Sequence, residues 1–326
     1  ARPKARPKAR DRRRAIKHLE EANMERSLAD IIEAVPTVDG AGVKLRRVFG
    51  FNERRGYDPF LLLDHFGSDD PADYLAGFPW HPHRGIETVT YLLAGRVAHG
   101  DSMGNRGTIG PGDAQWMTAG SGIIHQEMPE AGADGKTMEG FQLWVNLPAR
   151  LKMTEPRYRA VLAGEIPVIE SPGKKVAILA GEYGGHRGAT PDLFVPALYL
   201  IATLEPGATI GLDIPKSHNA AAYVFRGQAI SHNAKTIGAG NLGHFPSAAA
   251  PAPGSGELRT AGNEPTDTVA LRAGEAGASL LFIAGEPLGE PIAWGGPIVM
   301  NTREELRRAF LEYDEGTFIK VRAGGS

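Results

Sequence analysis

Short apolar runs rich in β-branched and aromatic residues recur along almost the whole chain, and glycine, proline or Asp-Gly closes most of them. Runs of this length are typical of strands bounded by turns, and they lack the 3.6-residue period of an amphipathic helix. The 42 glycines and 24 prolines among 326 residues fit a fold with many turns. The sequence therefore predicts an all-β protein, and its length predicts two domains of ordinary size.

The expected strands fall into two sets, separated by a polar, proline-bounded linker at residues 148–158. We therefore expect an N-terminal domain over residues 24–150 and a C-terminal domain over residues 151–326. A segment rich in alanine, proline and glycine at residues 247–256 is expected to form a loop. The first set of expected strands covers residues 43–49, 60–66, 86–95, 114–119, 122–128 and 141–147, and the second covers residues 176–181, 196–204, 220–227 and 279–285.

Residues 1–23 differ in composition from the rest of the chain. They repeat the tetrapeptide ARPK and hold nine Lys and Arg against three acids, which leaves residues 24–326 with a net charge of −8. Such a basic block can bind nucleic acid, but the abrupt change in composition favours a disordered extension that is foreign to the fold. Glu20 and Glu21 can be encoded by a ribosome-binding sequence shortly before Met24. We therefore expect Met24 to be the native start, and we do not expect nucleic acid as a partner.

One helix is expected, near the C-terminus. Thr302-Arg303-Glu304-Glu305 has the pattern of a capping box. Leu306, Phe310 and Tyr313 then recur at helical spacing, and Gly316 suits the position after the helix end. The apolar stripe predicts that this helix packs against a barrel.

The absence of cysteine excludes disulfides and thiolate metal ligands. It also fits a cytoplasmic location. No apolar stretch approaches the roughly 18 residues of a membrane span, and no apolar run follows the basic start as in a secretory signal. We therefore expect a cytoplasmic protein without membrane contact, whose metal ligands are limited to nitrogen and oxygen.

Two short motifs about forty residues apart predict a metal site. His81-Pro82-His83 and His125-Gln126-Glu127 each place two ligand-type residues at the spacing i, i+2, which puts both side chains on the same face of a strand. Two neighbouring strands would then aim three imidazoles and one carboxylate at one point. Gly120-Ser121-Gly122 before the second motif allows a tight turn.

This set of ligands suits Fe(II), Mn(II), Co(II) or Ni(II), and it leaves two octahedral positions open. Zinc fits less well because it prefers four tetrahedral ligands. A hydroxyl bound to such a metal becomes more acidic, and Glu127 is the carboxylate placed to accept its proton. Glu127 is therefore predicted both as a ligand and as a catalytic residue.

The stretch GFPWHPHRGIETVTYLLAGRVAHGDSMGNRGTIGPGDAQWMTAGSGIIHQEMP at residues 77–129 resembles the signature of pirins, a branch of the cupin superfamily. The resemblance continues through residues 141–158 and returns at residues 290–310. It implies a bicupin, in which two β-barrels lie face to face with iron in the N-terminal barrel. The positions that match the iron ligands of the family are His81, His83, His125 and Glu127. The C-terminal barrel is expected to hold no metal, because His218, His232 and His244 lack a paired ligand motif.

Other side chains near these motifs are expected to have supporting roles. Glu87 shares the face of His83, but four residues of straight strand separate their Cα atoms by about 13 Å. It is therefore expected to support the site from behind a ligand or to be structural. Asp64 and His65 are also expected to support the ligands, and Arg84 is expected to place positive charge at the pocket mouth.

Trp116 and Met117 lie on an expected core strand. Packing in the core is the favoured role for both, and lining the pocket is the alternative.

The resemblance implies a dioxygenase similar to quercetin 2,3-dioxygenase, which opens a flavonol-like enolic aromatic and releases carbon monoxide. The alternative from the same family is a redox-sensing, iron-binding protein that modulates a transcription factor or a metabolic enzyme. A zinc- or manganese-dependent cupin isomerase is less favoured, because no lysine-rich phosphate-binding motif lies near the ligands. Since fold alone does not fix function, the partner remains open between an aromatic small molecule and a regulatory protein.

Overall fold

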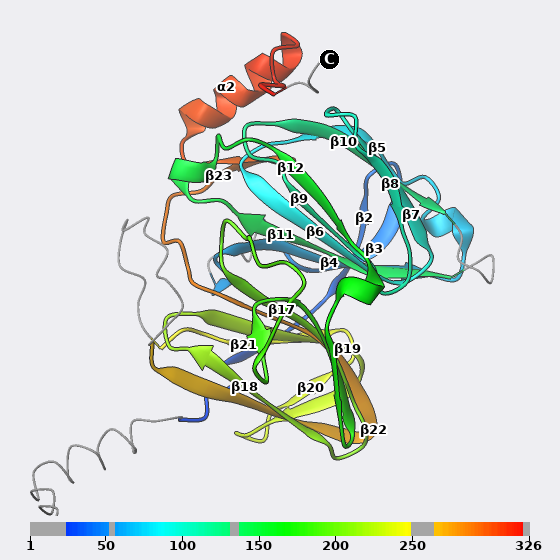
Figure 1. Ribbon diagram of the computed structural model, residues 1–326, viewed down its shortest axis with the longest axis vertical. Helices are drawn as coiled ribbons and strands as arrows, with labels where there is room; N and C mark the ends of the chain where they lie inside the picture. The colour runs from blue at the N-terminus through cyan, green and yellow to red at the C-terminus, as the bar shows by residue number, and fades with distance from the viewer. Residues whose placement is uncertain (1–23, 52–55, 131–136, 249–263, 322–326) are drawn as a thin grey trace, which may run out of the picture.

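A computed structural model describes residues 24–51, 56–130, 137–248 and 264–321, and it consists of two stacked β-barrels (Figure 1). The barrels are built almost entirely from antiparallel strands. This confirms the predicted all-β bicupin with a C-terminal helix. The expected extension at residues 1–23 and most of the expected loop at residues 247–256 lie outside the described residues.

The N-terminal barrel is formed by two sheets that face each other. The larger sheet has the order β12 (Arg157–Val161), β9 (Ala114–Thr118), β6 (Ile86–Ala94), β11 (Met138–Asn146), β4 (Phe60–Ser68), β3 (Val43–Phe49) and β2 (Val35–Asp39). The smaller sheet has the order β5 (Phe78–His83), β10 (Ile123–Glu130), β7 (Arg96–Asp101) and β8 (Arg106–Ile109). The smaller sheet carries both predicted ligand motifs, on the adjacent strands β5 and β10.

The C-terminal barrel is one sheet that bends around its own core. Its main path is β1 (Asp30–Glu33), β21 (Asn241–Phe245), β19 (Asn219–Ser231), β22 (Thr266–Gly285), β17 (Ala197–Leu204), β14 (Lys174–Ala180) and β13 (Val168–Ser171), with β18 (Thr209–Pro215) beside β22 and β20 (Thr236–Gly238) beside β19. Small hairpins are made by β15 (Glu182–Tyr183) with β16 (His186–Arg187) and by β23 (Ala293–Gly295) with β24 (Ile298–Met300). Three short 3-10 turns lie between strands that are consecutive in the chain: η2 (Pro71–Asp73), η3 (Ala149–Leu151) and η4 (Ala163–Glu165).

The two barrels have different interiors. Buried apolar side chains, mostly valine, leucine, isoleucine and alanine, fill the C-terminal barrel, among them Val224, Leu280 and Ala222. A second core cluster spans the junction, where Phe141 of the N-terminal barrel meets Tyr223 of the C-terminal barrel with ring centroids 6.1 Å apart. The closely packed C-terminal barrel therefore acts as a support, and the polar interior lies in the N-terminal barrel.

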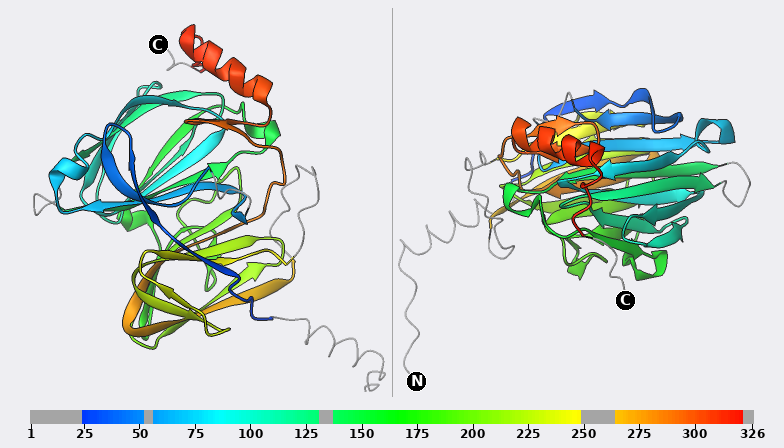
Figure 2. Two further views of the ribbon diagram at one scale, coloured as in Figure 1. Left: turned by 180° about the vertical axis from the view of Figure 1, so that it is seen from behind. Right: turned by 90° about the horizontal axis from the view of Figure 1, so that it is seen from above.

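Each end of the described chain packs on the barrel formed mainly by the other half. The bridge of Glu25 to Thr268 and the strand β1 add the N-terminal segment to the C-terminal sheet. In the opposite direction, β23, β24 and α2 (Arg303–Asp314) return to the N-terminal barrel, as Figures 1 and 2 show from opposite sides. We call residues 293–321, which contain these elements, the C-terminal arm. β12 also lies beyond residue 150 and pairs with β9. The division at residue 150 remains a prediction, and these segments cross it.

The predicted helix is confirmed as α2. Thr302 caps its start, because its side chain accepts from the Glu305 backbone N–H while the Glu305 carboxylate accepts from the Thr302 N–H. Gly316 follows the end with φ of 72°, a conformation that favours glycine. Leu306 packs on β23 and β24, so the helix rests on these two strands beside the N-terminal barrel.

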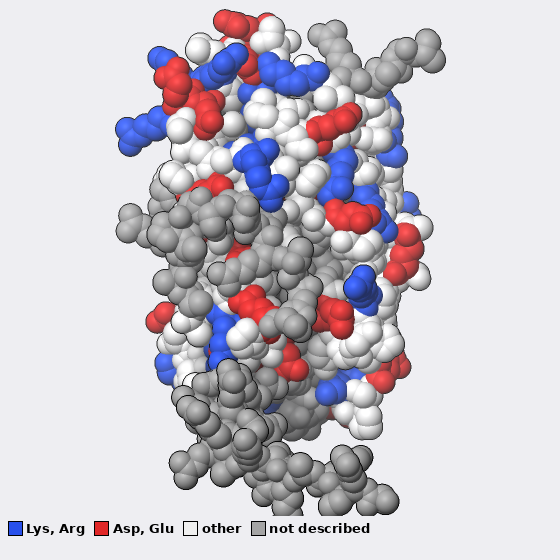
Figure 3. Space-filling model, turned by 60° about the vertical axis from the view of Figure 1, so that its left-hand side comes forward, with Lys and Arg blue, Asp and Glu red and all other residues white. Residues whose placement is uncertain are grey.

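Positive and negative side chains are interspersed on the face shown in Figure 3, and neither sign forms a continuous patch there. The single long helix of the described residues, α2, is too short and too polar to span a membrane.

Asp58 at the barrel junction gives the fold a specific pH dependence. Its Oδ2 accepts from the Gly289 N–H at 2.8 Å, Oδ1 is buried without a partner, and burial raises the pKa of the carboxyl from 3.8 to about 6. Between these two values the folded protein binds more protons than the unfolded chain, so this group makes stability fall as pH rises from 4 to 6. We expect Asp58→Asn to remove that fall, and thus to gain about 2 kcal/mol over the native protein between pH 4 and pH 7.

Urea unfolding of both proteins at several pH values measures this difference. The exposed Asp192→Asn variant is the matched control. A constant difference between Asp58→Asn and native protein across the range would contradict the prediction.

Candidate metal centre

Three of the four predicted ligands lie together inside the N-terminal barrel. β5 and β10 are antiparallel neighbours, and their register places His125 directly opposite His81. The ligand nitrogens of His81, His83 and His125 all lie within 4.8 Å of one another. The Nε2 atoms of His81 and His83 are 3.0 Å apart, and the His125 ring centroid is 4.3 Å from that of His81. The i, i+2 spacing therefore brings the three imidazoles to one point.

The hydrogen bonds behind two of these rings fix the side that faces the cluster. His81 Nδ1 donates to the Pro79 carbonyl at 2.9 Å, and His83 Nδ1 donates to the Pro297 carbonyl at 3.0 Å. Carbonyl oxygens only accept, so both rings carry their proton on Nδ1 and direct an Nε2 lone pair at each other. Two nitrogens bound at about 2.1 Å to one metal at right angles would be about 3.0 Å apart. The observed separation fits that arrangement.

His125 supports the same interpretation. Both of its ring nitrogens are buried and lack a hydrogen-bond partner among the described residues. An imidazole buried in this way is costly unless something else binds it, and a metal ion would. Burial lowers the pKa of His83 to about 3 and that of His125 well below its ordinary value, so both rings are neutral at pH 7, the form that binds metals.

Glu127 shares the barrel face of His125, but its carboxylate is held by other side chains. Oε1 accepts from the Thr90 hydroxyl at 3.0 Å, and Oε2 accepts from the Gln142 amide at 2.9 Å. The pairing of β10 with β5 shifts register between His125 and Glu127, so Glu127 lies opposite Phe78 rather than opposite Pro79. Each carboxylate oxygen keeps a further lone pair, which could bind a metal. Its role as fourth ligand remains a prediction.

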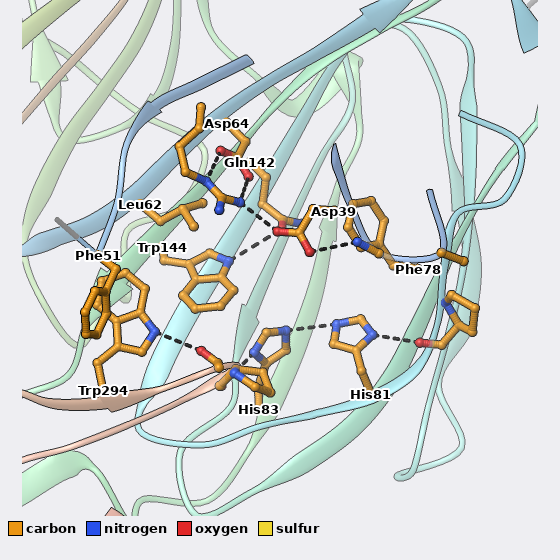
Figure 4. Close-up of a pocket in the computed structure, with 16 residues that line it drawn as sticks. Asp39, Phe51, Leu62, Asp64, Phe78, His81, His83, Gln142, Trp144 and Trp294 are labelled. Atoms are coloured by element: carbon orange, nitrogen blue, oxygen red, sulfur yellow. Dashed lines mark hydrogen bonds and ion pairs between the residues drawn. The ribbon is translucent and has the colours of Figure 1, made fainter. Parts of the chain in front are cut away.

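A cavity of about 640 Å³ opens onto His81 and His83. Aromatic rings form its walls: the ring centroids of Trp144 and Trp294 are 5.8 Å apart, and Phe51 packs edge-on against Trp294 at 5.5 Å (Figure 4). Trp294 belongs to β23, so the C-terminal arm completes the wall of a cavity in the N-terminal barrel. A flat apolar molecule would fit between these rings and the imidazoles.

The wall opposite the imidazoles carries charge. Arg47 donates to both oxygens of Asp64, at 2.9 and 2.8 Å, and to Asp39 at 2.7 Å (Figure 4). The hydrogen bond with Asp64 contributes most to raising the pKa of the Arg47 guanidinium, which stays positive. Asp64, predicted to support the ligands, instead lines this wall, where carboxylate oxygens could accept from hydroxyl groups of a bound molecule.

A polar layer that was not among the expected features lies behind the imidazoles. His99 of β7 is buried with its ring centroid 5.5 Å from that of His125, and it stacks on Tyr158 at 4.4 Å. Its Nε2 lies 3.4 Å from Asp101, and Gln115 lies 3.1 Å from its Nδ1. His99 and Asp101 have the same i, i+2 spacing as the ligand pairs, so the parity rule that found those pairs could have indicated this one.

Glu87 is structural rather than a neighbour of the ligands. It is fully buried, accepts from the Thr118 hydroxyl at 2.6 Å and lies 4.0 Å from Arg157, and burial raises the pKa of its carboxyl. Trp116 and Met117 are buried in two different core clusters, which confirms the favoured packing role.

The prediction that Arg84 charges the pocket mouth is wrong. Arg84 is buried and turned toward the C-terminal arm, where it donates to Glu312 at 2.7 Å and to the Phe318 carbonyl at 2.8 Å. It also donates to the Ser121 carbonyl at 2.7 Å, in the turn before His125. Arg84 therefore ties the two ligand-bearing segments to the end of the chain.

Two expectations remain, the supporting role of His65 and the tight turn before His125, and the structure bears out only the second. His65 is 2.9 Å from the Tyr223 hydroxyl and 3.2 Å from Glu139, so it joins the two barrels and does not support the ligands. Gly120 and Gly122 have φ of 47° and 135°, and a Cβ on Gly120 would clash with the Thr154 carbonyl. The tight turn and close backbone approach expected here are thus confirmed.

The described part of the chain has one cluster of at least three metal-ligand side chains, and it lies in the N-terminal barrel. His218, His232 and His244 of the C-terminal barrel are not part of it. Burial lowers the pKa of His218 to about 4, and the His244 ring packs on Tyr57 with centroids 4.9 Å apart.

Comparison with known proteins agrees with this architecture. The Pirin family model matches residues 42–145, and the model of the Pirin C-terminal cupin domain matches residues 199–319. A pirin-like protein from Caulobacter vibrioides is 43% identical over 296 residues, which cover 90% of this chain and 99% of the relative. A Pseudomonas aeruginosa protein named "Putative quercetin 2,3-dioxygenase PA3240" is 41% identical over 298 residues, which cover 89% of this chain and 97% of that protein.

Among solved structures, quercetin 2,3-dioxygenase from Acinetobacter baumannii superposes with a TM-score of 0.79 at 31% identity, covering 90% of this chain and 99% of that one. The family models together match most of the chain, and the relatives align over nearly its full length. The chain belongs to the pirin family of the cupin superfamily.

Proposed function

We propose that this protein is an Fe(II)-dependent dioxygenase of quercetin 2,3-dioxygenase type, with His81, His83, His125 and Glu127 as metal ligands. The observation that carries the proposal is the cluster of three imidazoles, two of which, His81 and His83, line an aromatic-walled cavity of about 640 Å³. Relatives that bear the name of this activity add support. In this proposal residues 24–150 form most of the metal-bearing barrel and residues 151–326 form most of the supporting barrel, while β1 and β12 each pair in the barrel of the other half.

In this proposal the tryptophan rings, the metal and Glu127 have different roles in the reaction. Trp144 and Trp294 hold the flat ring system and exclude water. When bound, the metal would acidify the enol hydroxyl of the substrate and allow reaction with dioxygen. In this proposal Glu127 accepts the enol proton, and hydrogen bonds from Thr90 and Gln142 fix the position of its carboxylate.

The proposed reaction is balanced with dioxygen as the oxidant. Two ring carbon–carbon bonds break, and the carbon that bore the enol hydroxyl leaves as carbon monoxide. Both atoms of dioxygen end in the organic product as an ester and a carboxyl group, and the proton held by Glu127 returns to that product.

The test starts with anaerobic protein loaded with Fe(II), and in parallel with Mn(II), Co(II), Ni(II) or Zn(II). We expect quercetin to bind without oxygen, and carbon monoxide to appear in equal amount with ring-opened product once oxygen is added. Glu127→Gln should lower turnover by about 10²–10³-fold, because the amide cannot take the proton. No carbon monoxide from fully iron-loaded protein would refute the proposal.

The second candidate from the family is a redox-sensing regulator, in which the iron state alters affinity for a protein partner. His81→Ala separates the two candidates. We expect it to abolish turnover of the small molecule, whereas a regulator would lose only redox-dependent binding of its partner.

A further inference from the structure

A second, smaller cavity lies inside the N-terminal barrel, beyond Glu127. It has a volume of about 20 Å³, above the roughly 10–15 Å³ that one water molecule needs, so it has room for one small molecule. Its walls are mostly apolar side chains of the core around β3, β4, β7 and β11. At its polar end lie Glu127, the proposed catalytic carboxylate, and Thr90 and Gln142, which donate hydrogen bonds to it. The apolar walls include Val43, Phe66, Val97 and Met138.

The polar end of this cavity offers little to a water molecule. Thr90 Oγ1 donates to Glu127 Oε1 at 3.0 Å, and Gln142 Nε2 donates to Glu127 Oε2 at 2.9 Å and lies 3.3 Å from Thr90 Oγ1. The donor groups at this end are therefore already bonded to Glu127 and to each other, and almost all of the surface that faces the cavity is apolar. A buried water needs two to four polar partners, so a cavity lined in this way favours a small apolar molecule over water.

The position of the cavity connects it to the proposed chemistry. Phe78 and Gln142 line both this cavity and the large one that opens onto His81 and His83. The Glu127 carboxylate lines the small cavity and lies on the same barrel face as His125. A molecule in the small cavity is thus separated from the ligand cluster by only Glu127 and the shared wall.

We propose that this cavity holds one molecule of dioxygen and supplies it to the metal from the side of Glu127, while the organic substrate enters through the large cavity. The delivery role rests on the dioxygenase function proposed above, whereas the binding of a small apolar molecule does not. Separate entry would let dioxygen reach the site after the flat substrate has closed the large cavity.

Two measurements test the inference. Crystals pressurised with xenon, an apolar probe, should show a xenon atom beside Val97 and Met138 in metal-free protein. Steady-state kinetics of the iron-loaded protein should show that Val97→Ile, which adds a methyl group to the cavity wall, raises the KM for dioxygen by about fivefold and leaves the KM for quercetin unchanged. Val48→Ile is the matched control, because Val48 is equally buried in this barrel but lies outside the cavity lining.

The outcomes separate the two proposals. Ordered water in the cavity, or xenon binding only elsewhere, would overturn the inference. An unchanged KM for dioxygen in an active Val97→Ile protein that no longer binds xenon would overturn the delivery role. Loss of carbon monoxide release in the native protein would refute the dioxygenase function, and the delivery role with it, even if xenon binds.

Discussion

Replacing His125 with alanine is expected to lower the affinity for Fe(II) by at least about 100-fold, more than the loss of a residue that only supports a ligand. The reason is that both ring nitrogens of His125 are buried and have no hydrogen-bond partner among the described residues, so only contacts with neighbouring imidazole rings otherwise hold it. Metal-free His125→Ala should remain folded, because the change leaves no hydrogen-bond partner unpaired. Metal competition titrations of native and variant protein, with circular dichroism of the metal-free forms, measure both effects.

Histidines of the C-terminal barrel supply the control for this experiment. His218→Ala and His232→Ala should keep the metal content of the native protein, and each should retain the rise in Tm that a bound metal gives. Equal metal affinity in native protein and His125→Ala would show that the cluster is not the metal site. If native protein bound two equivalents of metal and either control variant bound only one, the prediction that the C-terminal barrel holds no metal would be contradicted.

The largest effect on stability is expected for Lys152→Met. Lys152 is 2% exposed, and its ammonium group donates to the Gly85 carbonyl at 2.9 Å, to Asn146 Oδ1 at 2.8 Å and to the Val299 carbonyl at 3.0 Å. Burial lowers the pKa of this amine to about 7, and its three acceptors match the three protons of the charged form. Removing the amine takes a hydrogen bond from each of three buried acceptors, of which the Gly85 carbonyl keeps one from the Leu147 N–H at 3.3 Å. We expect a loss of about 3 kcal/mol in the free energy of unfolding.

Lys152 joins three segments of the chain near the candidate metal centre. Its three partners lie in the turn after the His81–His83 motif, at the end of β11 and in β24 of the C-terminal arm. Urea unfolding of the metal-free protein measures the loss directly. The exposed Lys175→Met should change stability by no more than about 0.5 kcal/mol. A loss that is equally small in Lys152→Met would mean that water replaces the amine without cost.

Much of the fold was readable because its signals are local. The run at residues 43–49 is β3 with the same bounds, and the expected strands at residues 60–66 and 86–95 differ from β4 and β6 by at most two residues at an end. The capping box at Thr302 likewise depends only on the four residues that form it. Strands that are short or polar, such as β8 and β20, were missed because few of their residues are buried.

In the candidate site, too, local spacing predicts some features, whereas others depend on segments that are distant in the sequence. Spacing alone predicted that His81 and His83 share a face, because side-chain direction alternates along any strand. Spacing could not show that the register of β10 shifts before Glu127, since a bulge depends on how two strands pair. Nor could it show that Arg84 turns away from the pocket, because its partners Glu312 and Phe318 come from the other end of the chain.

The sequence by itself determined the all-β class, the family and the three imidazoles, because each depends on residue type and on periodicity within a few neighbouring residues. Only the tertiary structure decided what surrounds them: Trp294 as a wall of the large cavity, Lys152 beneath the ligand turn, and the small apolar cavity beyond Glu127. These features join segments separated by tens to hundreds of residues. Their geometry follows from how the two barrels and the returning C-terminal arm pack, and no local pattern in the chain encodes that packing.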